Sequence, residues 1–241
     1  MKKILTIGIA SILTACGGGG GGGSTAPSAP PVTAEGFWEG TASTGTSVAL
    51  AVLEDGETWG VYTSGNSIAG ALYGQTTSSG TTLTGSGNDF NIAAHSVSSA
   101  TYNGTFVAKS TIRVASGGTT FSGNYAVAYD QPASLTALAG TFTGQGISGN
   151  SSAQTIPVTI STTGAITVPT SAGCGASGTA SPRATGKNIF DVLVTFNGTS
   201  CALGNGTITK GVGYFNATSR TLVVLALNSA KTDGFIYVGQ K

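Results

Sequence analysis

The chain has 241 residues, 39 of them glycine, and only 8% of its residues are charged. Its formal net charge at pH 7 is +1, and without Lys2 and Lys3 eight basic side chains remain against nine acidic ones. A balance this close to neutral excludes the basic face that nucleic-acid binding requires. Thr, Ser, Asn and Gly must supply most of the surface polarity, which favours an exported β protein over a cytosolic enzyme.

The first 15 residues predict a secretory signal peptide. Two lysines precede a ten-residue apolar run from Ile4 to Leu13, and small residues follow it. This order of basic, apolar and small residues is that of a secretory signal. The run is too short to cross a bilayer, which needs about 20 apolar residues. We expect cleavage between Ala15 and Cys16.

The tetrapeptide Leu13-Thr14-Ala15-Cys16 resembles the lipobox of bacterial lipoproteins. In that family the cysteine thiol is diacylglycerated, the signal is removed, and the new amino terminus is acylated, for example with palmitate. The resemblance implies that Cys16 anchors the protein to a membrane, because several acyl chains suffice without a transmembrane helix. Gly17 stands where an aspartate would favour the inner membrane, so the resemblance implies the outer membrane. The alternative is an ordinary signal peptide with a chance cysteine.

Residues 16–34 are predicted to form a flexible tether. Seven glycines, Gly17–Gly23, precede a stretch rich in Ser, Ala and Pro, with almost nothing apolar to bury. Such a chain is flexible at glycine and semi-extended at proline, with a reach of roughly 20 to 30 Å. It would hold a folded body away from the lipid surface.

From residue 35 onward the chain predicts antiparallel strands. Short apolar and polar alternation is bounded by turn residues, and no helical periodicity is sustained. In the run 189–196, Phe190, Val192, Val194 and Phe196 form one apolar face. The clearest strands are 48–53, 58–62, 124–129, 156–160, 189–196 and 222–227. Asn-Gly or Asp-Gly pairs predict tight hairpin turns at 55–56, 103–104, 197–198, 205–206 and 233–234.

The strands recur as a set. The segment Gly36–Gly40 is echoed by Gly140–Gly144, 104 residues later, and the turn at Asp55-Gly56 by Thr163-Gly164, 108 residues later. Recurring landmarks indicate two similar β units, with chance similarity in a chain rich in Gly and Thr as the alternative. We expect a first β domain at 35–130, a short helical linker at 131–139 and a second β domain at 140–241. Asp130 is a candidate cap for the linker helix, and Gly140 would end it.

The predicted fold is therefore all-β, with two tandem small antiparallel barrels or sandwiches. A barrel is favoured because hairpin turns dominate and long crossover loops are few. This plan and the tether are similar in architecture to surface lipoproteins related to transferrin-binding protein B, a resemblance that implies a fold and no ligand. A transmembrane barrel is disfavoured because the strands are short and aromatic girdles are not evident.

Cys174 and Cys201 are predicted to form a disulfide. With Cys16 taken by lipid, they are an even pair in an oxidising compartment. A disulfide between them would close a loop of about 27 residues, which is worth roughly 3 kcal/mol of stability in the chain-entropy model. A catalytic cysteine would need a histidine nearby, and the one histidine, His95, lies in the other unit.

Other candidate sites lack the rest of their motif, and we expect no metal and no cofactor. The segment Gly144–Gly149 matches G-x-G-x-x-G, but that motif binds pyrophosphate only where a strand turns into a helix. The acidic segment Glu54–Glu57 lacks the spacing of a calcium loop and predicts a solvated hairpin tip. His95 could ligate haem or act as a base, but no partner is placed near it, so a loop histidine is favoured.

One candidate binding site is a ligand cup inside the first barrel. Eight-stranded barrels are wide enough to hold one small molecule, or to be filled by side chains. The candidate lining residues are aromatic: Trp38, Trp59, Tyr62, Tyr125 and Tyr129. Core packing of the same residues is the alternative.

The sequence predicts a non-enzymatic protein, because no acid/base pair or activated nucleophile can be assembled from its spacing. We expect a lipid-anchored lipoprotein of the outer membrane, on its periplasmic or cell-surface face. Its β domains would bind a macromolecule or a small ligand. The alternative is a structural or protective envelope component, including an inhibitor of a wall-cleaving or host enzyme.

Overall fold

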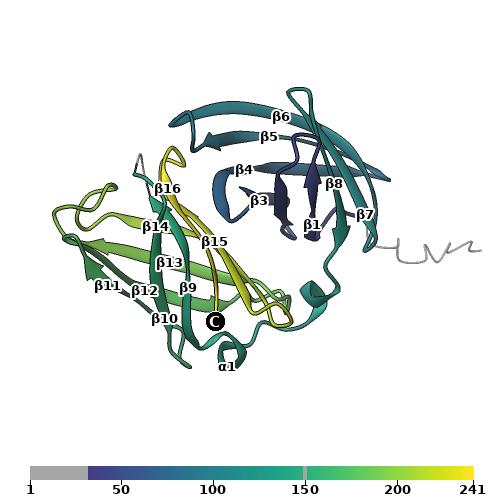
Figure 1. Ribbon diagram of the computed structural model, residues 1–241. Helices are drawn as coiled ribbons and strands as arrows, with labels where there is room; N and C mark the ends of the chain where they lie inside the picture. Colours follow the sequence, from purple (N-terminus) through teal and green to yellow (C-terminus); the bar gives the residue numbers. More distant parts are fainter. Residues whose placement is uncertain (1–31, 149–150) are drawn as a thin grey trace, which may run out of the picture. The chain divides into compact units, whose positions relative to one another are not determined.

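A computed structural model describes residues 32–148 and 151–241 and contains two closed antiparallel barrels of eight strands each (Figure 1). The predicted all-β fold with two tandem units is confirmed, and the units are barrels. In each barrel the last strand pairs with the first, which closes the sheet. The shortest pairing is that of β10 with β11, at Thr159–Thr167 and Ile160–Ile166. The predicted signal peptide, its cleavage site at Ala15 and Cys16, and the tether up to residue 31 lie outside the described residues.

The first barrel is an up-and-down arrangement of hairpins. Its strands are β1 (Gly36–Ala42), β2 (Ser47–Val52), β3 (Glu57–Ser64), β4 (Ser67–Ser79), β5 (Thr82–Asn91), β6 (Ser96–Val107), β7 (Thr111–Ser116) and β8 (Thr119–Tyr125). The strand predicted at 124–129 is wrong beyond Tyr125. There the chain enters a single 3₁₀ turn, η1 (Val127–Asp130), and the Asp130 carboxylate at its end pairs with Lys109 and Lys187.

The second barrel has the same order of hairpins. A short helix, α1 (Leu135–Leu138), leads into it, and its N-cap is Ser134, whose hydroxyl accepts a hydrogen bond from the Ala137 amide at 3.2 Å. The prediction of Asp130 as the cap is wrong, since its carboxylate is used by the two lysines. The strands are β9 (Gly140–Ser148), β10 (Gln154–Ile160), β11 (Ala165–Ser171), β12 (Cys174–Pro182), β13 (Phe190–Asn197), β14 (Ile208–Asn216), β15 (Thr221–Leu227) and β16 (Gly234–Gln240).

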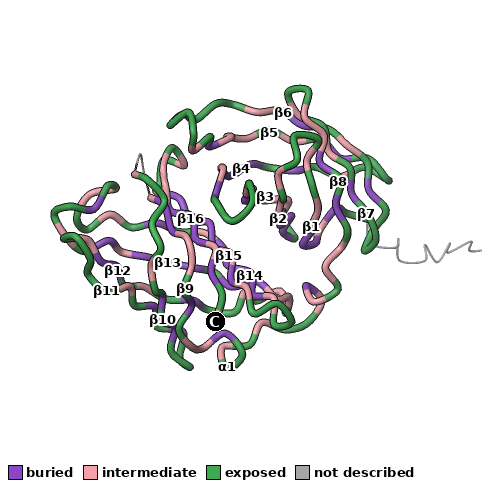
Figure 2. The backbone as a smooth tube through the Cα atoms, viewed as in Figure 1, coloured by how far each residue is buried: buried purple, intermediate pink, exposed green. Residues whose placement is uncertain are grey.

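Buried and exposed residues alternate along the strands (Figure 2). The predicted apolar face of 190–196 lies in the interior of the second barrel, with all four side chains buried. Glycines also face the interiors, and aromatic rings lie against them: Tyr102 covers Gly85, and Tyr237 covers Gly239. This pairing lets large rings fit inside a narrow barrel.

The hairpin turn predicted at Asn103-Gly104 is wrong, because both residues lie inside β6. A side chain at Gly104 would collide with the backbone of Arg113 in β7. The glycine therefore serves close strand approach rather than turn formation. Lys109, with a φ of +54°, occupies the turn between β6 and β7 instead.

The sequence repeat is a repeat of structure. Gly40 in β1 and Gly144 in β9 both lie so close to the closing strand that a Cβ would collide with its backbone. The turn glycines Gly56 and Gly164 have φ angles of +82° and +84°, which favour glycine. Their carbonyls accept hydrogen bonds from Thr76 and Ala180, both at 2.7 Å. Chance similarity does not explain these matched roles.

An apolar cluster joins the outer faces of the two barrels, which belong to one compact unit. Strand β3 contacts β15, and β4 contacts β16 and β9. At its centre the rings of Phe37 and Tyr214 stack, with centroids 3.6 Å apart and planes inclined by 14°. The cluster includes Phe37, Trp59, Val61, Ile68 and Tyr129 from the first barrel and Ile147, Ile189, Val212, Tyr214, Leu225 and Ile236 from the second.

An ion-pair network lies between the barrels. The Arg183 guanidinium contacts Glu54 and Asp191, each at 2.8 Å, and Asp55 at 3.5 Å. Burial alone would lower the pKa of Arg183, but its hydrogen bonds to Glu54 and Asp191 outweigh burial and raise the pKa above its usual value. The prediction of a solvated acidic hairpin tip is therefore only half correct. The segment is a hairpin, and two of its carboxylates pair with Arg183, 128 or more positions away.

We expect Asp130→Asn to destabilise the protein at neutral pH, because it removes the ion pairs with Lys187 and Lys109. The loss should be only roughly 1 kcal/mol, because Lys109 is largely exposed and solvent screens its pair with Asp130. Burial alone would raise the pKa of Asp130, but hydrogen bonds from Lys187 and Lys109 lower it to about 2. The carboxylate therefore stabilises the fold above its ordinary pKa of 3.8, and this contribution is lost as the pH falls toward 2. Urea unfolding at pH 7 and pH 2.5 measures the difference.

The matched control is Asp233→Asn, because the Asp233 carboxylate makes no salt bridge within the described residues. Its stability should follow the wild type at both pH values. A difference between Asp130→Asn and wild type that persists unchanged at low pH would contradict the assignment.

Candidate ligand-binding cavities

The first barrel holds an open cup of about 570 Å³. Its rim is formed by the hairpin loops β1–β2 and β7–β8, together with the adjoining ends of β3, β5 and β6. Its lower wall is apolar, with Val48, Leu50, Leu72, Val114 and Phe121. Its upper wall is polar, with Thr44, Thr46, Asn91, Ser98, Ser99, Ser116 and Thr119. Glycine and serine have small side chains, so the interior positions that they occupy leave space at one end of the barrel.

The cup has one charged side chain in its wall, Asp89. The Tyr62 hydroxyl donates a hydrogen bond to the Asp89 carboxylate at 2.8 Å. Burial, and then the hydrogen bond to Asp89, raise the pKa of Tyr62 above its usual range. Tyr62 is therefore a neutral donor at physiological pH, and Asp89 is held in position at the wall.

The opposite end of the first barrel is filled. Trp38 is fully buried, and its indole Nε1 donates a hydrogen bond to the Ala34 carbonyl at 3.1 Å. Ala34 was predicted as the last residue of the tether, but it is completely buried and its amide donates to the Ser78 hydroxyl at 2.9 Å. The folded body therefore includes Ala34. Ala34 packs into the core at the filled end of the first barrel. Leu138, 104 positions later, packs in the same way into the core of the second barrel.

The structure separates the five aromatic residues predicted to line the cup. Tyr62 lies in its wall, and Trp38 and Tyr125 pack edge to face at the filled end, with centroids 5.2 Å apart. Trp59 and Tyr129 belong to the cluster between the barrels, so their placement in the cup is wrong. Trp59 is an odd number of positions from Tyr62 in β3, so it points to the other face of the strand.

Asp89, Asn91 and the serines of β6 are lining residues that the sequence did not single out. Strand alternation offered one usable signal, because it places positions 98, 100 and 102 of β6 on the face that carries the buried Tyr102. Their convergence with Tyr62 depends on the pairing of β5 with both β4 and β6. The local sequence does not determine which strands pair.

The second barrel contains a smaller cavity of about 150 Å³ that is open at one end. Its wall is aliphatic and aromatic, with Ile156, Val158, Ile166, Val192, Val194, Val224, Phe235 and Tyr237. Leu138 of α1 and Phe190 close one end. At the other end the lining includes Ser148, Ser171, Cys174 and Ser200.

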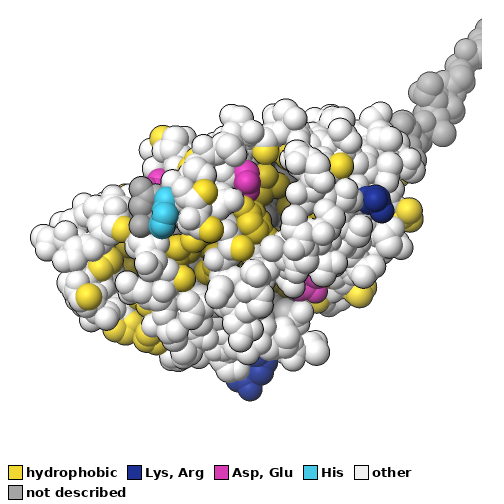
Figure 3. Space-filling model, turned by 45° about the horizontal axis from the view of Figure 1, so that its top comes forward, with side chains coloured by type: hydrophobic (Ala, Val, Ile, Leu, Met, Phe, Trp, Pro, Cys, Tyr) yellow, Lys and Arg dark blue, Asp and Glu magenta, His cyan; other side chains and the backbone are white. Residues whose placement is uncertain are grey.

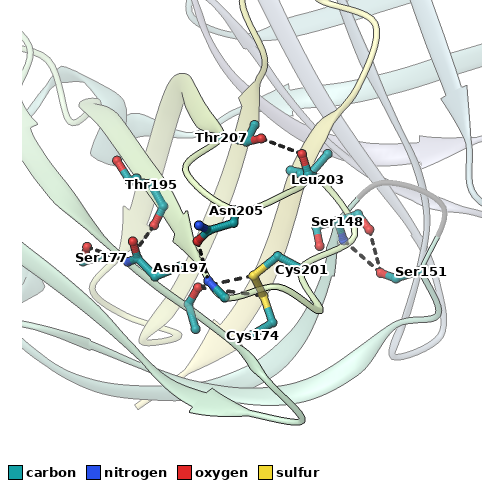
Figure 4. The surroundings of a disulfide bond; sticks show 12 residues. Ser148, Ser151, Cys174, Ser177, Thr195, Asn197, Cys201, Leu203, Asn205 and Thr207 are labelled. Carbon is teal, nitrogen blue, oxygen red and sulfur yellow. Dashed lines mark hydrogen bonds between the residues drawn. A yellow bond between two sulfur atoms is a disulfide. The ribbon is translucent and has the colours of Figure 1, made fainter.

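The predicted disulfide between Cys174 and Cys201 is confirmed (Figure 4). Cys174 is one of the residues that line the open end of the cavity. The disulfide joins the hairpin between β11 and β12 to the loop between β13 and β14. On the same rim the Ser151 hydroxyl donates a hydrogen bond to the Ser148 carbonyl at 2.6 Å. The disulfide therefore joins two loops of the opening, and the serine hydrogen bond lies within a third.

The remaining predicted features serve the fold. His95 is an exposed residue of the β5–β6 turn with a φ of +47°, a conformation in which histidine is enriched. The segment Gly144–Ser148 of the glycine motif lies in β9, and Gly149 is outside the described residues. Across the part of the chain that the structure covers, no cluster of three or more side chains suited to metal binding occurs. No helix within those residues is long and apolar enough to span a bilayer.

Comparison with protein-family models found no match, and a search of curated proteins found no similar sequence. Figure 3 shows that charged side chains are sparse on the face it displays, and that hydrophobic atoms are visible in its recesses.

Proposed function

We propose that this protein is a non-enzymatic, lipid-anchored lipoprotein of the outer membrane that binds a small ligand in the cup of the first barrel. The observation that carries the proposal is the open cup of about 570 Å³, a volume in the range of small-molecule sites. The resemblance of residues 13–16 to a lipobox supports the anchor. A cup filled by side chains would have favoured a purely structural role.

The lining favours a neutral or cationic ligand with one apolar face. Asp89 is the single charged group of the wall among the residues that the structure describes, so an anion would meet repulsion without a basic partner. Asn91 and the rim hydroxyls can exchange hydrogen bonds with a polar edge. Leu50, Leu72 and Val114 offer an apolar surface deeper in the cup. Few, well-placed polar groups above an apolar wall are typical of ligand sites.

The cup is tested by screening a library of neutral, cationic and anionic fragments against the purified full chain by ligand-observed NMR. We expect neutral or cationic binders that Ala100→Trp abolishes, because Ala100 lines the cup. Val107→Trp, on an exposed position of the same strand, is the control and should bind as the wild type does. Absence of any binder, or binders unaffected by Ala100→Trp, would refute the ligand site.

The anchor is tested separately by Cys16→Ala. Membrane fractionation and metabolic labelling with palmitate should show that this variant loses both the label and the outer-membrane location. A variant that keeps both would refute the lipobox assignment while leaving the cup unaffected. A protein that is anchored but binds no fragment would favour the structural or protective role.

A further inference from the structure

The second barrel contains a cavity whose chemistry differs from that of the first-barrel cup. Among the described residues, none of its lining side chains carries a charge, and its middle is walled by Val, Ile, Leu and Phe. We propose that this cavity is a second binding site, for a small apolar molecule of about the size of benzene. The two sites share no lining residue.

The volume supports this ligand size. An apolar protein cavity of about 150 Å³ lined by Leu, Ile and Phe stays dry and binds benzene or xenon. The cavity here has about the same volume, 150 Å³, and the same kind of wall. Filling it would restore dispersion contacts that its lining atoms lack.

Water is a poor occupant of the same space. A buried water needs two to four polar partners, and apart from Tyr237 the side chains of the deep wall are apolar. The backbone pairs between all neighbouring strands, although β10 and β11 pair only at Thr159–Thr167 and Ile160–Ile166. The Tyr237 hydroxyl, the polar atom of the deep wall, donates to the Ile156 carbonyl at 3.5 Å. Polar side chains occur at the rim, in Ser148, Gln154 and Ser200.

The rim gives the ligand a defined entrance. The Cys174–Cys201 disulfide holds two loops of the open end together, whereas Leu138 blocks the other end. A rim fixed before binding lowers the ordering cost of binding. The site therefore has a closed floor, an apolar wall and a covalently held opening.

The test uses benzene and xenon as probes on the purified full chain with labelled Ile, Leu and Val methyl groups, followed by NMR. We expect saturable shifts of the methyls of Val192, Val194 and Val224, and no shift of Leu50 or Leu72 in the first-barrel cup. Site-specific methyl shifts distinguish binding in the cavity from partition into lipid or detergent. Glycerol, a polar probe of similar size, should shift none of them.

Two variants fill the cavity from two neighbouring strands, at positions that are paired across β11 and β12. Ala176→Leu adds volume at a buried wall position, and Val168→Phe adds it at a half-buried one, so one remains informative if the other fails to fold. Each should weaken benzene binding by at least about tenfold, which is about 1.4 kcal/mol. Ala165→Leu makes the same change as Ala176→Leu at an exposed position of β11 and should bind benzene as the wild type does.

The proposal is overturned if benzene and xenon leave the wild-type cavity methyls unshifted, or if folded Ala176→Leu and Val168→Phe bind benzene unchanged. It does not depend on the first-barrel cup. Ala100→Trp should abolish fragment binding in the cup and leave the benzene shifts intact, so that failure of either site can be recognised separately.

Discussion

Tyr214→Ala is expected to lower the free energy of unfolding by about 3 to 5 kcal/mol, the usual loss for truncating a buried aromatic residue. Tyr214 is 3% exposed and its ring stacks on Phe37 of the other barrel. We expect the shared apolar cluster to couple the unfolding of the two barrels, so its loss should also separate their transitions. Both tryptophans, Trp38 and Trp59, lie in the first barrel. Fluorescence therefore reports on the first barrel, and far-UV circular dichroism on both.

In the wild type the fluorescence and circular dichroism transitions should coincide, and in Tyr214→Ala they should diverge. Tyr214→Phe is the matched control. The Tyr214 hydroxyl is buried and has no hydrogen-bond partner among the described residues, and burial raises the pKa of this tyrosine to about 12. Removing an unsatisfied buried hydroxyl should leave stability unchanged or increase it. Coincident transitions in the alanine variant would show that the cluster does not couple the barrels.

Replacing both Cys174 and Cys201 with alanine is expected to destabilise the second barrel by about 3 kcal/mol, since the disulfide closes a loop with a sequence separation of 27 residues. The double substitution avoids leaving a reactive free thiol. Thermal unfolding followed by circular dichroism should show the loss. Cys174 lines the opening of the apolar cavity, so benzene binding should also weaken as the rim loosens.

Reduction of the wild type provides an independent control. Reduced wild type should match the double alanine variant in unfolding temperature, whereas reductant should not affect the variant. A variant as stable as oxidised wild type would mean that native contacts alone hold the two rim loops together.

The sequence predicts local structure and symmetry well in this protein. The apolar face of 190–196 follows from alternation alone, and the disulfide follows from the count of cysteines. The repeat at Gly36 and Gly140 locates the first strand of each barrel because the closing strand approaches too closely for a side chain at Gly40 or Gly144. Each of these features depends on residues near one another in the chain or on a simple spacing rule.

The errors arise where one residue type serves two physical roles. Asn103-Gly104 has the composition of a hairpin turn, but its glycine accommodates close strand approach inside β6. Trp59 and Tyr62 are both aromatic and near one another in β3, yet strand alternation places them on opposite faces. Composition does not distinguish these roles, because the distinction depends on the neighbouring strand.

By itself, the sequence determined the β class, the two-unit organisation, the paired cysteines and the near-neutral charge, because periodicity, repeats and counts are properties of the chain. Only the tertiary structure decided that the outer faces of the barrels share a core, that Arg183 pairs with Glu54, and that each barrel keeps a cavity. The contacts between the barrels depend on which strands pair. The cavities depend on how much interior space remains where the side chains are as small as those of glycine and serine. The contacts between the barrels join residues that are distant in the chain, 129 positions apart for Arg183 and Glu54, and no local pattern encodes them.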